Sequence, residues 1–116
     1  MPPRTVAETS CIKSTRATDI LAVVKTVGVP RTNRNNKTIT DVTLIDDSTA
    51  SNGKLATVVI SVWGQQKVEV LQRNECQSMV FFNLSATYRD GHLNIDHYED
   101  NECFQAPECE KTVALR

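Results

Sequence analysis

The segment Thr57–Gly64, TVVISVWG, most constrains what this 116-residue chain can fold into. Two sets of residues alternate along it: Val58, Ile60 and Val62, and Val59, Ser61 and Trp63. This period of two is typical of a β-strand with one face toward a core. The other face ends in Trp63, the only tryptophan. Tryptophan is usually well buried, so Trp63 either packs at the core or stays outside for a flat ligand; we favour the second interpretation.

Four further segments have strand character, and one has helix character. The strand segments are Ile20–Val27, Thr38–Asp47, Ser78–Tyr88 and His92–Tyr98. Between the third and fourth strands, Gln65–Arg73 predicts a short helix because Val68 and Leu71 are three residues apart. In Ser78–Tyr88, strict alternation places Val80, Phe82, Leu84 and Ala86 toward the core and Phe81 on the other face.

Five strands with a helix between the third and fourth follow the order of the OB-fold, a small Greek-key β-barrel. The sequence therefore predicts an all-β, five-stranded OB-fold barrel over residues 19–100. We expect residues 1–18 to form a polar N-terminal tail. We expect residues 101–116 to form an acidic segment with a short C-terminal helix, because Pro107 stands where a helix can start and Glu108 and Glu110 follow it.

Several classes of protein do not fit the composition. No apolar run approaches the ~20 residues of a membrane span, and the N-terminus lacks the pattern of a signal peptide, so we expect no membrane partner. The four cysteines lack the spacing of a zinc site, and the two histidines do not complete one. We expect reduced thiols in an intracellular protein, with no metal and no cofactor.

Carboxylates give little support to an enzyme. A metal-dependent nuclease needs clustered carboxylates, whereas the aspartates are spread over different predicted elements: Asp41, Asp46, Asp47, Asp90 and Asp96. Adjacent strand residues point to opposite faces, so Asp46 and Asp47 are expected to cap a turn rather than to share a metal.

Charge is distributed unevenly along the chain. Residues 96–116 hold six of the fourteen acidic residues and two of the thirteen basic ones, which leaves eight acidic and eleven basic residues in 1–95. A weakly basic body permits nucleic-acid binding without requiring it. The loop 29–37, VPRTNRNNK, has three basic residues, three asparagines and no acid. It is either an ordinary solvated hairpin loop or a loop whose cations contact phosphates and whose amides contact bases.

The ligand face of an OB-fold involves strands 2 and 3 and the loops between strands 1–2 and 4–5. Three kinds of candidate residue fall there. Trp63 and Tyr88 can stack on bases; Arg31, Arg34, Lys37, Lys54 and Arg89 can contact phosphates; and Asn33, Asn35, Asn36 and Thr43 can bond base edges or sugars. Tyr88 shares the inward parity of Leu84, so core packing is its alternative unless the strand has already turned into the loop.

Three motifs carry a resemblance to a known family: DVTLIDDS, the strand that ends in VWG, and the strand that ends in a Tyr–Asp-Gly turn. Together they resemble the single-stranded-DNA-binding OB domains of the replication protein A large subunit, most closely the second such domain. Trp63 and Tyr88 match its stacking positions. The resemblance covers residues 19–116 and implies single-stranded DNA binding without catalysis, in a nuclear, replication protein A-like complex that acts in recombination and repair.

Two features depart from this pattern: the long turn STASNGKLAT and the acidic C-terminal segment. They favour a paralogue, a meiosis-specific OB-domain relative of that subunit, with this chain as one domain of a longer protein. The alternative function is an OB domain that docks a protein, either in the same groove or through the acidic segment 96–110.

Overall fold

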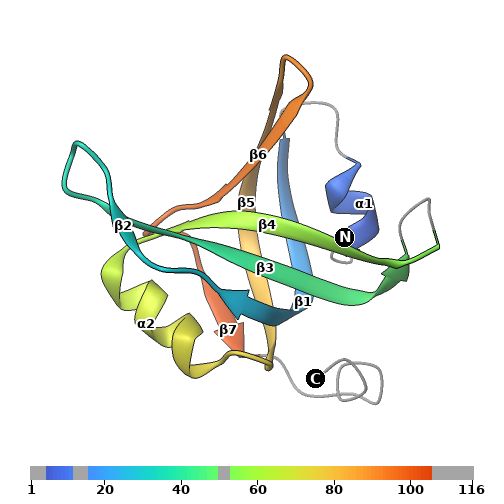
Figure 1. Cartoon of the computed structure of the whole chain (residues 1–116), viewed down its shortest axis with the longest axis horizontal. Coiled ribbons are helices and arrows are strands. Elements are labelled where there is room, and N and C mark those ends of the chain that lie inside the picture. Colours follow the sequence, from blue (N-terminus) through green and yellow to red (C-terminus); the bar gives the residue numbers. More distant parts are fainter. Residues whose placement is uncertain (1–4, 12–15, 50–52, 106–116) are drawn as a thin grey trace.

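The computed structural model describes residues 5–11, 16–49 and 53–105 (Figure 1). The strands are β1 (Arg16–Val27), β2 (Arg31–Thr32), β3 (Thr38–Thr49), β4 (Leu55–Trp63), β5 (Ser78–Arg89), β6 (His92–His97) and β7 (Cys103–Gln105), and the helices are α1 (Val6–Ser10) and α2 (Gln65–Arg73). The expected helix Gln65–Arg73 is therefore present, whereas the expected C-terminal helix falls outside the described residues.

The strands form a closed barrel. β3 pairs antiparallel with both β1 and β4, β1 also pairs with β5, β5 pairs with β6, and a short parallel pairing of β4 with β6 completes the circle. This is the predicted five-stranded OB-fold, in which β2 adds to β3 and β7 adds to β5. In Figure 1, α2 lies across one end of the barrel and the β5–β6 turn projects from the other.

The alternation in β4 organises the core as the sequence predicts. Val58, Ile60 and Val62 are buried, whereas Val59 is 54% exposed and Trp63 is only half-buried. Helix α2 adds Val68 and Leu71 to the buried residues. One face of β4 thus fills the barrel and the other is left at the surface.

The predicted alternation in β5 is wrong for its first half. Phe81 is fully buried in the core and Phe82 is half-buried, the reverse of the expectation, while Leu84 and Ala86 point inward as expected. The cause is a β-bulge: Asn83 has a positive φ of 59°, and the pairing with β1 shifts register there. An extra residue in one strand exchanges the faces of the residues before it.

Residues 5–11 differ from the polar tail expected for the N-terminus. They contain α1, which has a Thr5–Glu8 capping box and buries Val6 completely in the core. The backbone N–H of Val6 donates to Asp46 Oδ2 at 2.8 Å, and Ser48 N–H donates to Asp46 Oδ1 at 2.8 Å. The expectation that Asp46 caps a turn is therefore wrong: Asp46 lies within β3, which continues to Thr49, and its carboxylate instead holds α1 against the barrel.

The bulge yields a stability prediction. Asn83→Val should lower the free energy of unfolding by about 1–2 kcal/mol, because a β-branched residue is strained in the left-handed region. Asn83→Gly should change it by less than about 0.5 kcal/mol, because glycine adopts this conformation freely. Urea denaturation followed by fluorescence measures both. Equal stability of the two variants would show that the positive φ at this position is not required.

Candidate functional site

Two aromatic residues, half-buried Trp63 at the end of β4 and exposed Tyr98 just after β6, form the most distinctive surface. The rings of Trp63 and Tyr98 lie with centroids 5.4 Å apart and planes inclined by 45°. They line a cavity of about 640 Å³, here called the aromatic pocket, whose lining residues are Lys37, Trp63, Gly64, Tyr98, Glu99 and Asp100. A tilted pair that lines a pocket can offer ring surface to a ligand even though Trp63 is half-buried.

Strand pairing and one hydrogen bond fix the orientation of Trp63. It is the last residue of β4, on the face opposite the core. Its indole Nε1–H donates to Asp96 Oδ1 at 3.1 Å, and Asp96 stands on β6 in register with Ser61. Because the polar edge of the indole is held, the ring face is pre-oriented for contact.

The backbone conformation at position 64 requires a glycine after the tryptophan. The φ of Gly64 is +109°, which disfavours residues with a side chain, and its N–H donates to the carbonyl of Thr38 at 2.9 Å. A Cβ at this position would lie 3.0 Å from Glu99 Cγ. The glycine therefore lets the chain leave β4 while Glu99 approaches closely.

Tyr98 was assigned no role from the sequence. It is 40% exposed and begins a turn, Tyr98–Asn101, in which Tyr98 N–H donates to Asn101 Oδ1 at 2.9 Å and Asn101 N–H donates to the Tyr98 carbonyl at 3.0 Å. Partial burial, followed by the Asp96 carboxylate, raises the pKa of the Tyr98 phenol, so the ring stays neutral. The parallel register of Val62 with His97 is the signal that places position 98 beside position 63.

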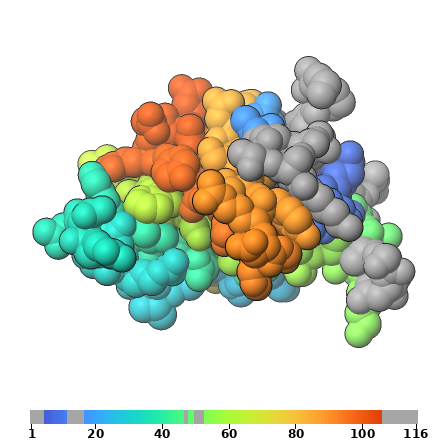
Figure 2. Space-filling model, turned by 90° about the horizontal axis from the view of Figure 1, so that it is seen from above, coloured from blue at the N-terminus to red at the C-terminus, as the bar shows by residue number. Residues whose placement is uncertain are grey.

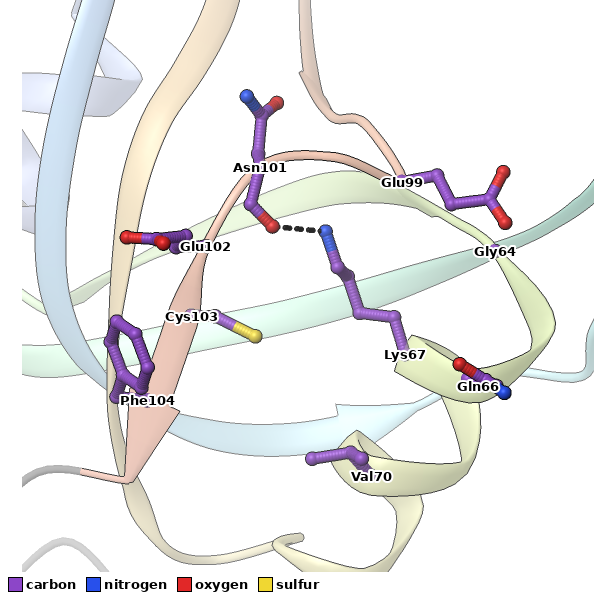
Figure 3. Close-up of a pocket in the computed structure, with 9 residues that line it drawn as sticks. All are labelled: Gly64, Gln66, Lys67, Val70, Glu99, Asn101, Glu102, Cys103 and Phe104. Carbon is purple, nitrogen blue, oxygen red and sulfur yellow. Dashed lines mark hydrogen bonds between the residues drawn. The ribbon is translucent and has the colours of Figure 1, made fainter.

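Lys67 on α2 holds the Tyr98–Asn101 turn, and Figure 3 shows its bond to the Asn101 carbonyl. Its Nζ donates to the carbonyl oxygens of Tyr98 and Asn101 at 2.5 and 2.6 Å. It points into a second pocket of about 340 Å³, which shares Gly64 and Glu99 with the aromatic pocket. Burial lowers the pKa of the Lys67 amine, while nearby acidic groups oppose the shift. The position of the Tyr98 ring thus depends on a lysine in another element.

His97 completes this anchor. It is fully buried, with its ring edge-on to Phe81 at 5.4 Å between centroids. Its Nε2 lies 3.1 Å from the Glu102 carbonyl and its Nδ1 lies 3.2 Å from Lys67 Nζ. The consistent arrangement is a neutral ring in which Nε2–H donates to the carbonyl and Nδ1 accepts from the lysine. Burial, followed by the Lys67 charge, lowers the pKa of His97 to about 4.

The hairpin between β1 and β3 brings basic residues near the aromatic pocket. Arg31 pairs with Ile39, which pairs with Trp63, so these three positions form one row across β2, β3 and β4. Arg31 also forms an ion pair with Asp41 at 3.3 Å, and Lys37 Nζ lies 4.0 Å from Glu99 Oε2. Arg34 is exposed. The structure thus gathers Arg31 and Lys37 with Trp63.

The asparagines of this hairpin have different roles. Asn33 Oδ1 accepts from the backbone N–H groups of Asn35 and Lys37 at 2.9 and 3.0 Å, so it organises the loop and is not free for a base edge. Asn36 adopts a φ of +60°, which asparagine tolerates. The side chain of Asn35 is exposed, and among the described residues it neither bonds the loop backbone as Asn33 does nor stands at a positive φ as Asn36 does.

The remaining predicted site residues lie apart from the aromatic pocket. Thr43 is half-buried on β3 opposite Val59, on the same outer face as Trp63. Tyr88 is half-buried opposite Leu93, and five residues of β6 separate that level from Tyr98, or about 16 Å. Arg89 follows Tyr88 into the β5–β6 turn.

Lys54 precedes Trp63 by nine positions, about 30 Å along β4.

Seen from above, the hairpin that carries β2 (cyan) and the β5–β6 turn (orange) protrude at different places, with lime-coloured atoms of the β4 region reaching the surface between them (Figure 2).

Within the described residues, no group of three or more His, Cys, Asp or Glu side chains is placed to hold a metal ion. Neither of the two helices in the described ranges is long and apolar enough to cross a membrane.

Comparison with solved structures identifies the class of fold. The OB domain of Ta0387 from Thermoplasma acidophilum is similar, with a TM-score of 0.56, 12% sequence identity, and coverage of 80% of this chain and 77% of that one. A mitochondrial single-stranded-DNA-binding protein of S. cerevisiae has a TM-score of 0.55 and 14% identity, and covers 84% of this chain and 99% of its own. No family model and no curated protein matches the sequence. The chain therefore has an OB-fold.

The buried histidine predicts a pH dependence. The folded state holds the pKa of His97 at about 4, below the ordinary 6.5, so between these values the unfolded chain binds a proton that the folded chain does not. The His97 contribution to stability is full above pH 6.5 and falls as the pH drops to 4, by at most about 3 kcal/mol.

His97→Gln should remove this component, because an amide can accept from Lys67 and donate to Glu102 without titrating. Urea denaturation of both proteins between pH 7.5 and 4 measures it. The carboxylates titrate in both, so the difference between the two curves is the relevant quantity, and parallel curves would contradict the assignment.

Proposed function

We propose that this domain binds single-stranded DNA and performs no catalysis. The observation that carries the proposal is the pair of half-buried Trp63 and exposed Tyr98, next to the basic hairpin, on the face that OB-folds use for oligonucleotides. That one of the similar structures is a mitochondrial single-stranded-DNA-binding protein supports it.

Each chemical part of a single strand has a matching group on this face. Bases can stack on the rings of Trp63 and Tyr98, which is worth about 1–3 kcal/mol per base and tolerates any sequence. Phosphates can approach Arg31, Arg34 and Lys37 along the hairpin. In this proposal Tyr98 replaces Tyr88 as the second stacking residue, because Tyr98 contacts Trp63 directly.

We also propose a narrower identity, which rests on the sequence motifs alone. The DVTLIDDS strand and the VWG strand end support a replication protein A-like protein, and the sequence of the segment STASNGKLAT supports a meiosis-specific relative of its large subunit. Such a protein would act in the nucleus, in recombination and repair, with protein partners and further DNA-binding domains. Linked domains would raise the overall affinity through effective concentration.

Fluorescence anisotropy with a labelled oligo-dT of about 30 nucleotides tests the site. Trp63→Ala and Tyr98→Ala should each weaken binding about tenfold or more, since one stacking contact is worth about 1–3 kcal/mol. Tyr88→Ala is the matched control and should change binding less than about threefold.

With about three phosphate contacts at ~0.7 each, the plot of log affinity against log salt should have a slope of about −2. Absence of binding at low salt would overturn the proposal for this domain. Binding that is indifferent to Trp63 but sensitive to Tyr88 would move the site to the β5–β6 turn.

A further inference from the structure

The charge around the aromatic pocket is opposite to what a phosphate backbone needs. Glu99 and Asp100 line the pocket and Asp96 holds the Trp63 indole, whereas Lys37 is the one basic residue among the lining side chains. Carboxylates so close to the rings repel an anionic ligand and attract a cationic one. The pocket therefore has a binding preference that DNA stacking does not explain.

The rings themselves favour the same kind of ligand. The faces of tryptophan and tyrosine attract ammonium and guanidinium groups within about 6 Å, and tryptophan does so most strongly. Trp63 and Tyr98 are inclined by 45°, so a cation in the angle between them can contact both faces. Asp96 accepts a hydrogen bond from the indole, and partial burial followed by the Asp96 carboxylate raises the pKa of the Tyr98 phenol, so the phenol stays neutral.

A lysine of the chain itself already occupies the edge of this pocket. Lys37 Nζ lies 4.0 Å from Glu99 Oε2, a loose ion pair between two exposed side chains. Such a pair contributes little to stability and is exchanged at low cost. Lys37 is thus a weakly held internal cation at the edge of the pocket, and Asp100 is exposed beside it.

The second pocket adds an apolar position next to the cationic one. It shares Gly64 and Glu99 with the aromatic pocket, and its wall includes Val70 and Phe104, which are 38% and 53% exposed. The Phe104 ring contacts Phe82 at 6.2 Å between centroids. An extended peptide can therefore place a basic side chain in the aromatic pocket and an apolar one against Phe104.

We propose that the aromatic pocket binds a lysine or arginine side chain of a basic–apolar segment in a partner protein. Asp100 and Glu99 supply the negative charge, and Trp63 and Tyr98 supply the ring faces. This site uses the same rings as the proposed DNA contact, so the peptide and a single strand compete. It does not require that the domain bind DNA.

The test titrates the protein with the peptide GSGRLGSG and follows the fluorescence of Trp63, the only tryptophan. The control peptide carries citrulline, a neutral isostere, in place of arginine, and should bind at least tenfold more weakly. Tyr98→Leu and Asp100→Asn should each weaken arginine-peptide binding about fivefold. Asp90→Asn in the β5–β6 turn removes the same charge elsewhere and should leave it unchanged.

Lys37→Met provides an opposed pair of effects. It removes the internal cation, so peptide binding should strengthen about threefold, while oligo-dT binding should weaken because a phosphate contact is lost. Equal binding of the citrulline peptide, or equal effects of Asp90→Asn and Asp100→Asn, would overturn the proposal. Peptide binding without oligo-dT binding would support it and remove the DNA function; the reverse would remove the peptide site alone.

Discussion

The barrel closes because one long strand, β1, pairs with two others at once. Its residues Arg16–Val23 pair with β5 and Val23–Val27 pair with β3. Each pairing contains a register shift, between Thr18 and Ile20 with β5 and between Val24 and Thr26 with β3, and such irregularities bend a strand. Core packing, the reversed faces of β5 and the position of the β5–β6 turn all depend on this closure.

Residues whose environment is set locally were predictable from the sequence. The alternation of Val58, Ile60 and Val62 and the helical spacing of Val68 and Leu71 needed no partner to be interpreted, and the order of elements then indicated the OB-fold. Phe81 and Phe82 were not predictable, because a bulge opposite β1 decides their faces. Helix α1 escaped detection because its five residues bury little more than Val6 and Thr9.

The site divides in the same way. Trp63 and the basic hairpin were evident from residue type and order, but the pairing of Trp63 with Tyr98 depends on a parallel contact between distant strands. Asn33 lies in the basic loop and was predicted to contact a ligand. Its side-chain oxygen instead accepts hydrogen bonds from the loop backbone, which only the structure shows. Lys67 had no signal at all, because its role comes from two carbonyl oxygens more than thirty positions away.

The parallel contact between β4 and β6 has a consequence for how the domain responds to a ligand. Only two residue pairs join these strands. Side-chain hydrogen bonds add to this contact, from Trp63 to Asp96 and from Lys67 on α2 to the Tyr98–Asn101 turn. A ligand that contacts both Trp63 and Tyr98 bridges the contact between β4 and β6. A ligand bound to Trp63 and Tyr98 therefore opposes the separation of β4 from β6. The backbone amides of β6 should exchange with solvent more slowly as the ligand concentration rises above its dissociation constant.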